Sequence, residues 1–322
     1  MLTEMKYVYT IYKEKSFSKA AKVLNISQPA LSAAVKKLEY QIGQPIFKRD
    51  TVPLTVTPAG EYFIKCAEEM LRLGNNMQKY FDDSNKALSK HLVLGGSSYF
   101  CSYVYPNLIN EFHKTFPNVK VEINEGNVRE LLKGLEDESL DIIFETAISD
   151  DIPNLNRYYY ASEYVLLAVP ASWPINEELT SYKLSEIDFQ NRNYLKQDFP
   201  GVPLLKFKDS PFIRMKPGND QWARGSNLCK NAGFVPKAIF DMDQVLTSVL
   251  VASSTGCGAV FIRDTLAKRL NHEQVALCYY KIDDPLAKRS ILVATKKKRY
   301  VTKAMKDFLQ MFLPTDLPEQ QD

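Results

Sequence analysis

Three polar side chains follow one another at four-residue intervals: Gln28, Ser32 and Lys36. A helix would place them on one face, because residues four apart lie above one another on a helical surface. Glutamine can form two hydrogen bonds to adenine in the major groove, and lysine can contact a phosphate. The residues that would face inward are apolar, Leu31, Val35 and Leu38. The spacing therefore predicts a DNA-reading helix with a buried apolar side.

The segment from 43 to 57 is typical of a wing, a short hairpin beside such a helix. Phe47 and Leu54 should pack inward, while Lys48 and Arg49 should project toward the DNA backbone or the minor groove. Two adjacent cations also occur on ordinary solvated edges, so this role depends on the neighbouring recognition helix. The DNA-binding residues that we expect are Ser27, Gln28, Pro29, Ser32, Lys36, Lys48 and Arg49.

The elements that must position these side chains have their own local signals. Residues 2 to 14 predict a bracing helix, and Ser18 is expected to cap a second, short helix. Ser27 should cap the recognition helix, with Pro29 in its first turn, where a missing N–H costs nothing. Two short helices joined at residues 25 to 27 predict a helix-turn-helix.

Five sequence blocks carry a resemblance to a known family. In order along the chain they are Phe17 to Leu24, Ser27 to Ser32, Leu38-Glu39, Gly43 to Arg49 and Leu54 to Gly60. Each block alone would fit any helical bundle, but together and at these spacings they resemble the DNA-binding half of a LysR-type transcriptional regulator. Many relatives carry an arginine after the residue matching Ser32, whereas this chain has Ala33-Ala34. Hydrogen bonding to bases should then depend more on Gln28 and Ser32, and recognition of DNA shape by the wing should contribute more to specificity.

Residues 59 to 90 predict a long linker helix. Apolar residues recur there at alternating spacings of four and three, which is a heptad seam. In the resembled family this helix dimerises the DNA-binding domains, and an amphipathic helix lying on its own domain is the alternative. The expected dimerisation residues are Phe63, Cys66, Met70, Leu73, Met77 and Tyr80.

From residue 91 the chain alternates strand-like and helix-like runs, which predicts an α/β domain with a largely parallel sheet. Its landmarks resemble the effector domain of the same family, a two-lobed fold similar to periplasmic solute-binding proteins. The boundaries that we expect are a winged helix-turn-helix at 1–58, a linker at 59–90 and an effector domain at 91–322. Lobe I would comprise about 91–163 and 265–322, and lobe II about 164–264.

A ligand would sit where strand ends and helix starts converge between the lobes, because free N–H groups there suit small anions. Lys216 would favour an acidic effector and Glu145 an amine or hydroxyl, so the charge of the effector stays open. Phe261 would form an apolar wall. The expected effector-binding residues are Ser97, Ser98, Tyr99, Asn127, Glu145, Thr146, Lys216, Gly218, Asn219 and Phe261.

Composition supports a nucleic-acid-binding segment at the start of the chain. The first sixty residues hold nine Lys and Arg against four acids, a net of +5, and the remaining residues hold 32 against 34, a net of −2. No apolar run is long enough to span a membrane and no secretory signal is present, so we expect a cytoplasmic protein. The five cysteines form no C-x-x-C pair, which predicts inert thiols, although a redox role for one of them stays open.

Catalytic and metal-binding patterns are scarce. The three histidines, His91, His113 and His272, accompany no nucleophile motif, so we expect neither an enzyme nor a metal or cofactor. The prediction is a homodimeric or tetrameric transcriptional regulator that binds promoter double-stranded DNA under the control of a small-molecule effector. Its rivals are a cytoplasmic ligand-binding or enzyme domain with an accessory helical segment, and an architectural DNA-binding protein without an effector. The effector, the target promoter and the sign of regulation stay open.

Overall fold

The computed structural model describes residues 1–48, 53–84, 91–146, 148–149, 151–217, 219–271 and 275–313. The chain divides into two compact units. The first comprises Met1–Ser89 with Arg299–Thr302, and the second comprises Lys90–Lys298 with Lys303–Asp322.

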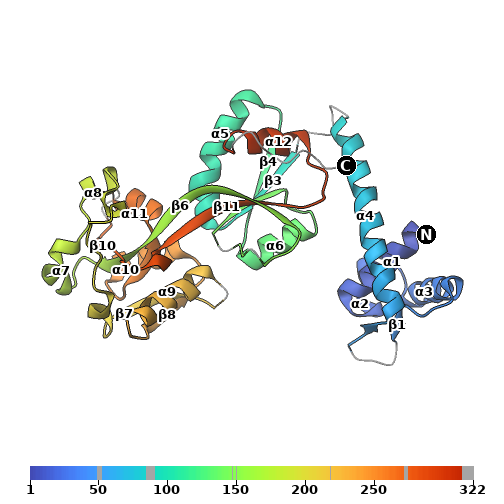
Figure 1. Ribbon diagram of the computed structural model, residues 1–322, viewed down its shortest axis with the longest axis horizontal. Coiled ribbons are helices and arrows are strands. Elements are labelled where there is room, and N and C mark those ends of the chain that lie inside the picture. The colour runs from blue at the N-terminus through green and yellow to red at the C-terminus, as the bar shows by residue number, and fades with distance from the viewer. Residues whose placement is uncertain are drawn as a thin grey trace. The chain divides into compact units, whose positions relative to one another are not determined.

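The first unit is a winged helix-turn-helix followed by one long helix, as the sequence predicted (Figure 1). Its apolar side chains, among them Val8, Ala20, Leu31 and Phe47, form a single core. The elements are α1 (Leu2–Glu14), α2 (Phe17–Val23), α3 (Gln28–Ile42), β1 (Phe47–Lys48), β2 (Thr55–Val56) and α4 (Pro58–Ser84).

Caps fix the two ends of the helix-turn-helix. Ser27 caps α3 by accepting a hydrogen bond from the Ala30 N–H at 3.3 Å, as predicted. The prediction for α2 was wrong: its cap is Ser16, not Ser18. Ser16 has the extended backbone that a cap requires and accepts from the Lys19 N–H, whereas Ser18 lies inside the first turn.

The wing is a two-residue antiparallel ladder in which Phe47 lies opposite Val56. The Phe47 ring packs edge-on against Phe17, with ring centroids 5.7 Å apart. One oxygen of Glu39, on α3, accepts hydrogen bonds from the Ile46 and Phe47 N–H groups, at 2.8 and 3.3 Å. These contacts attach the base of the wing to the recognition helix.

The second unit contains a seven-stranded mixed sheet and a separate two-stranded sheet. The large sheet comprises β3 (His91–Gly96), β4 (Lys120–Glu125), β5 (Ile142–Glu145), β6 (Leu155–Pro170), β9 (Val260–Arg263), β10 (Leu277–Lys281) and β11 (Lys288–Lys296). The small sheet pairs β7 (Pro211–Met215) with β8 (Lys237–Met242). The helices are η1 (Phe100–Val104), α5 (Tyr105–Thr115), α6 (Val128–Glu136), α7 (Ile175–Glu178), η2 (Thr180–Tyr182), α8 (Glu186–Gln190), η3 (Asn193–Leu195), η4 (Leu204–Phe207), α9 (Asp220–Asn231), α10 (Val245–Thr255), α11 (Asp264–Asn271), η5 (Pro285–Ala287) and α12 (Lys303–Gln310).

Two long antiparallel strands, β6 and β11, connect the two lobes of this unit (Figure 1). The first half of β6 pairs with β11, which pairs in turn with β5, and its second half pairs with β9 and β10. The expectation of a largely parallel sheet was therefore wrong, because every pairing of β6 and β11 is antiparallel. Only β3 with β4, β3 with β5, and β7 with β8 run parallel among the named strands of the described residues.

The chain returns to the first lobe later than expected. We placed the return near residue 265, but α11 and β10 contribute Leu266, Leu270 and Tyr279 to a core of the second lobe. The crossing back is made by β11, residues Lys288–Lys296. A separate apolar cluster, which includes Leu131, Leu135 and Ile143, forms the core of the first lobe.

Candidate functional site

The outward face of α3 carries the polar side chains predicted to read DNA. Gln28 and Lys36 are exposed and Ser32 is half-buried, whereas the opposite face, with Leu31, Val35 and Leu38, is buried. Pro29 lies in the first turn of α3, and Ser27 is its cap. Lys48 is exposed at the end of β1, and Arg49 lies outside the described residues. The structure thus places Gln28, Ser32 and Lys36 on one helix face.

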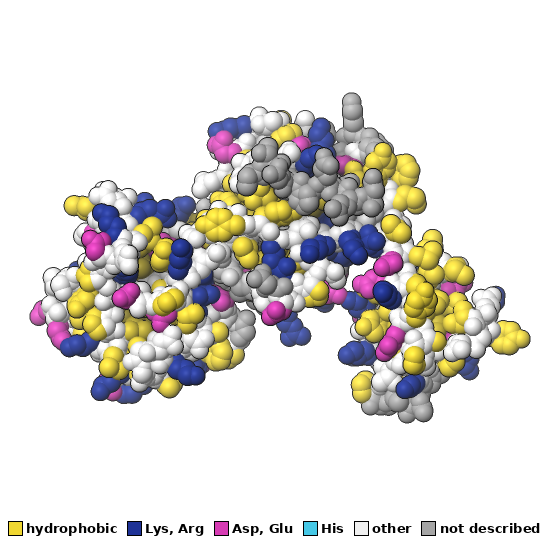
Figure 2. Space-filling view, in the orientation of Figure 1, with side chains coloured by type: hydrophobic (Ala, Val, Ile, Leu, Met, Phe, Trp, Pro, Cys, Tyr) yellow, Lys and Arg dark blue, Asp and Glu magenta, His cyan; other side chains and the backbone are white. Residues whose placement is uncertain are grey.

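Helix α4 has one side on the core of its own unit and another that is apolar and exposed. Ile64 and Ala67 are buried, and Phe63 packs partly against the same core. Of the predicted seam, Phe63 and Cys66 are half-buried, whereas Met70, Leu73, Met77 and Tyr80 are 43 to 61% exposed. Figure 2 shows hydrophobic side chains along the length of this helix.

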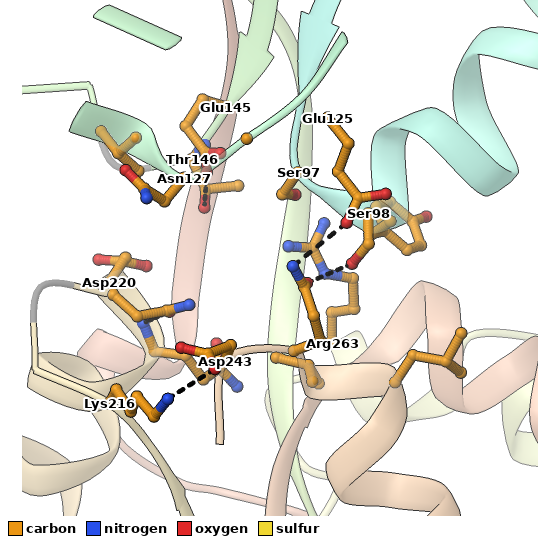
Figure 3. A pocket seen from close by; sticks show the side chains of 18 of the residues that line it. Ser97, Ser98, Glu125, Asn127, Glu145, Thr146, Lys216, Asp220, Asp243 and Arg263 are labelled. Atoms are coloured by element: carbon orange, nitrogen blue, oxygen red, sulfur yellow. Dashed lines mark hydrogen bonds and ion pairs between the residues drawn. The ribbon is translucent and has the colours of Figure 1, made fainter. Parts of the chain in front are cut away.

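A cavity of about 580 Å³ lies between the two lobes of the second unit (Figure 3). It brings together the ends of β3 and β5 from the first lobe and the starts of α9 and α10 from the second. The predicted residues that line it are Ser97, Ser98, Tyr99, Asn127, Glu145, Thr146, Lys216 and Asn219. Gly218 lies outside the described residues.

Phe261 does not line this cavity. Its ring stacks on Phe212 at 5.8 Å within the core of the second lobe. The neighbouring Gly225 on α9 leaves room for it, since a side-chain carbon there would come within 2.7 Å of the ring. The apolar wall that we expected from Phe261 is therefore wrong. Tyr103, Leu246 and Leu266 supply apolar surface instead.

Three helices begin at the cavity. Asn127 caps α6 by accepting a hydrogen bond from the Glu130 N–H at 3.1 Å. Asn219 caps α9 by accepting from the Gln221 N–H at 2.9 Å, and Gln244 precedes α10. Because the N-terminus of a helix carries a partial positive charge, the three starts favour negative charge in the space between them.

Charged side chains of the connecting strands form the inner wall, and sequence reasoning missed them. Glu163 on β6 lies directly opposite Arg289 on β11, and Arg289 Nε donates to Glu163 Oε1 at 2.6 Å. Arg263 at the end of β9 lies 3.3 Å from the other oxygen of Glu163. All three side chains are buried. Arg263 and Arg289 line the cavity.

Burial shifts the ionisation of the groups on this wall. The guanidinium of Arg263 lies over the Tyr99 ring, 4.0 Å from its centroid. Burial lowers the pKa of Arg263, and the charge of Glu163 partly opposes that effect. Burial also raises the pKa of Glu145, although hydrogen bonds from Thr146 favour its charged form.

A polar bridge crosses between the lobes beside the cavity (Figure 3). The Ser98 hydroxyl donates to Gln244 Oε1 at 2.5 Å, and Gln244 Nε2 donates to Glu125 Oε1 at 3.2 Å. Sequence reasoning did not assign Gln244 to the site, because a single sequence does not show which side chain reaches across a cleft. Its bridging position makes it a further candidate for ligand contact.

Two histidines outside the cavity have structural partners. His91 lies 3.4 Å from Glu122, and His113 contacts the Val119 carbonyl oxygen. His272 lies outside the described residues. Burial raises the pKa of Cys101 to about 11 and that of Cys229 to about 12. Within the described part of the chain, no cluster of three His, Cys, Asp or Glu side chains could hold a metal ion.

No helix in the described ranges combines the length and the apolar character needed to cross a bilayer. On the face of the second unit that Figure 2 shows, acidic and basic side chains are intermixed.

Two family models cover most of the chain. Residues 2–61 match the bacterial regulatory helix-turn-helix protein of the lysR family, and residues 85–315 match the LysR substrate binding domain. A similar curated protein is the uncharacterized HTH-type transcriptional regulator YcgK of Bacillus subtilis. It is 28% identical over 312 residues, which span 95% of this chain and 92% of that protein.

Solved structures share the fold at lower identity. A full-length OxyR variant from Pseudomonas aeruginosa aligns with a TM-score of 0.55 at 20% identity, covering 97% of this chain and 99% of that one. CbnR in complex with its target DNA aligns with a TM-score of 0.52 at 17% identity, covering 96 and 97%. The chain therefore belongs to the LysR family, whose members are transcriptional regulators with a DNA-binding helix-turn-helix and a ligand-binding domain, and not enzymes.

Proposed function

We propose that this regulator reads promoter DNA through α3, with Gln28 and Ser32 at base edges and Lys36 at a phosphate. The observation that carries this proposal is the polar outward face of α3 opposite a fully apolar inner face. Lys48 at the wing would contact the DNA backbone, and Arg49 retains the same expected role. The similar protein CbnR was solved with its target DNA, which supports this mode of action.

The exposed apolar side chains of α4 would pair with those of a second copy. Met70, Leu73 and Met77 are large hydrophobic residues at heptad spacing on a surface that a single chain leaves open to water. A dimer would present two recognition helices to one operator, which suits two half-sites one helical turn or more apart. Because the protein would have to reach promoter DNA, the same proposal assigns it to the cytoplasm.

The cavity between the lobes would hold the small-molecule effector. Ser97, Asn127, Thr146 and Asn219 present hydroxyl and amide groups beside helix starts, an arrangement that suits a small polar ligand. A ligand that binds one arrangement of the lobes better than another would shift promoter occupancy or DNA bending by that difference in affinity.

The test is the binding of the full chain to duplex DNA from the region upstream of its own gene, with a shuffled duplex as control, over a series of salt concentrations. The native duplex should bind more tightly at every salt concentration, and the affinity of both should fall steeply as salt rises. Equal affinity for the two duplexes would contradict sequence-specific binding to that region.

A further inference from the structure

The acids that line the cavity are all engaged by neighbouring donors. They are Glu125, Glu130, Glu145, Asp220 and Asp243, and each accepts at least one hydrogen bond. Asp220 accepts a hydrogen bond from Arg289 at 2.6 Å, and Asp243 accepts one from Lys216 at 2.7 Å. Two of these five carboxylates, Asp220 and Asp243, therefore pair with cations of the protein, and the other three accept hydrogen bonds from neutral groups.

Arg263 differs from the other buried arginine of the cavity in what surrounds it. Arg289 has two carboxylates, Glu163 and Asp220, each at 2.6 Å. Among the described residues, Arg263 has one ion-pair partner, a share of Glu163 at 3.3 Å, and Glu145 attracts it from a greater distance. Within the described ranges, its Nη1 meets no hydrogen-bond acceptor of suitable geometry. A guanidinium carries five donors, so Arg263 retains unused hydrogen-bonding capacity although it is only 7% exposed.

Arg263 lines the cavity, with its Nη1 directed at Glu163 and aromatic rings beside its guanidinium. The Tyr99 ring covers one side of the guanidinium at 4.0 Å, and Phe100 lies 5.2 Å away. Figure 3 shows the guanidinium extending from the second lobe toward Ser97 and Ser98 of the first. The hydroxyl oxygen of Ser97 is buried and has no hydrogen-bond partner in the described part of the molecule. A donor-rich cation and an unused hydroxyl thus belong to two residues of the same cavity wall.

We propose that the cavity takes a small organic carboxylate, and that Arg263 receives its negative charge while Ser97 donates a hydrogen bond to it. This proposal rests on the proposed function, because it identifies the chemical class of the effector of the same site. Arg263 is a buried cation that shares its carboxylate partner with Arg289, and the single negative charge of a ligand carboxylate would complete its pairing. The planar guanidinium can form two parallel hydrogen bonds to a planar carboxylate. The starts of α6, α9 and α10 add favourable potential. Tyr103 and Leu266 offer apolar surface for the rest of the ligand.

The experiment uses the full chain and matched pairs of small molecules that differ in charge: butyrate and butyramide, nicotinate and nicotinamide, succinate and succinamide. Thermal unfolding and calorimetric titration measure binding. At least one carboxylate should raise the unfolding temperature and bind more tightly than its amide. Arg263→Gln should weaken that binding by about tenfold or more, because a charge-assisted hydrogen bond is lost.

Two further variants separate a ligand contact from a folding defect. Arg263→Lys keeps a cation beside Glu163 but loses the fork, so it should fold normally and still bind the carboxylate less tightly than the wild type. Lys268→Gln is the control, since Lys268 is an exposed cation of α11 that does not line the cavity. It should bind the carboxylate as the wild type does.

Several outcomes would overturn the proposal. They are binding of the amides as tight as that of the acids, carboxylate binding unchanged in Arg263→Gln, and no binding by any carboxylate of the panel. Failure of the proposed function has a different signature, which is carboxylate binding that depends on Arg263 but leaves promoter affinity unchanged. Conversely, promoter affinity that responds to an uncharged molecule, and no longer does so in Ser98→Trp, would keep the proposed function and reject the carboxylate.

Discussion

Glu163 and Arg289 form a directly opposed cross-strand pair on the two strands that connect the lobes, with Nε and Oε1 2.6 Å apart. Both side chains are buried, with exposures of 0 and 4%. The pair lies where β6 and β11 cross from one lobe to the other. Arg289 also lines the cavity, so the pair belongs both to the cavity wall and to the two strands that would bend if the lobes moved.

Removing one partner of this pair should be costly. Arg289→Met would leave Glu163 buried beside a single incomplete partner, which typically costs about 3–5 kcal/mol of the free energy of unfolding. Denaturant titration of the full chain measures that loss. The conservative variant Arg289→Lys keeps a cation beside Glu163 and should lose less, whereas adding Glu163→Met to Arg289→Met would also remove the ion-pair partner of the buried Arg263. A single variant as stable as the wild type would show that buried Glu163 does not depend on Arg289 to offset the loss of solvation.

Two glycines of α4 should respond in opposite ways to alanine. A side-chain carbon at Gly60 would overlap the carbonyl oxygen of Ile46 at the base of the wing, whereas Gly74 has open space around it. Gly60→Ala should destabilise the first unit by about 1–3 kcal/mol through overpacking. Gly74→Ala should stabilise it by about 0.5–1 kcal/mol, since glycine is costly inside a helix. Thermal unfolding compares the two, and equal effects would contradict the close approach at Gly60.

Local patterns predicted the elements better than the contacts between them. The apolar spacing of Leu31, Val35 and Leu38 was sufficient to place α3. Glu163, Arg263 and Arg289 were missed because they meet only through the antiparallel register of three strands far apart in sequence. Each of them lies in a strand with buried apolar residues beside it, so a charge next to a buried run was the one available signal.

The same reasoning accounts for the site residues that were found. Strand ends and helix caps are local features, so Ser97, Asn127 and Asn219 could be assigned to one cavity before the fold was known. Phe261 could not, because an apolar residue at a strand end faces either the cavity or the core. The Phe261 ring lies in the core, where Gly225 leaves room for it.

The assignment of Gln28 to a base and Lys36 to a phosphate predicts that their variants lose DNA affinity in two different ways. Gln28→Ala should cost roughly 1–3 kcal/mol at one base position and relax specificity there. Lys36→Ala should weaken binding to all duplexes similarly and flatten the salt dependence by about one phosphate contact. Fluorescence anisotropy with single-base variants of the operator separates the two patterns. Identical, sequence-independent losses in both variants would contradict the assignment of reader and anchor.

The exposed seam of α4 predicts the behaviour of charged variants. Met70→Glu with Leu73→Glu would place like charges in the interface of a dimer and should abolish α4-mediated pairing in sedimentation experiments. Operator affinity should fall by about 100-fold or more, because binding at one half-site no longer assists the other. The control is Lys65→Glu with Asn75→Glu, two exposed positions of α4 outside the seam. Wild-type mass and affinity in the seam variant would mean that α4 does not pair.

Glu145 predicts a dependence of stability on pH. Burial raises its pKa above the ordinary value of 4.5. The folded state then binds a proton more readily than the unfolded state between the two values, so the free energy of unfolding falls as pH rises through that window. Above the folded pKa, the whole cost of burying the charge is present.

Glu145→Gln should remove this cost while keeping an oxygen that can accept the hydrogen bond of the Thr146 N–H, 2.7 Å away in the wild type. The variant should therefore unfold at a higher temperature than the wild type at about pH 7, and the difference should shrink toward about pH 4, where the wild-type carboxyl is neutral. Thermal unfolding over this range measures the trend, and Glu177→Gln, at an exposed site in the same unit, should show no comparable gain. A variant that is less stable at about pH 7 would mean that attraction to Arg263 and Arg289 outweighs desolvation.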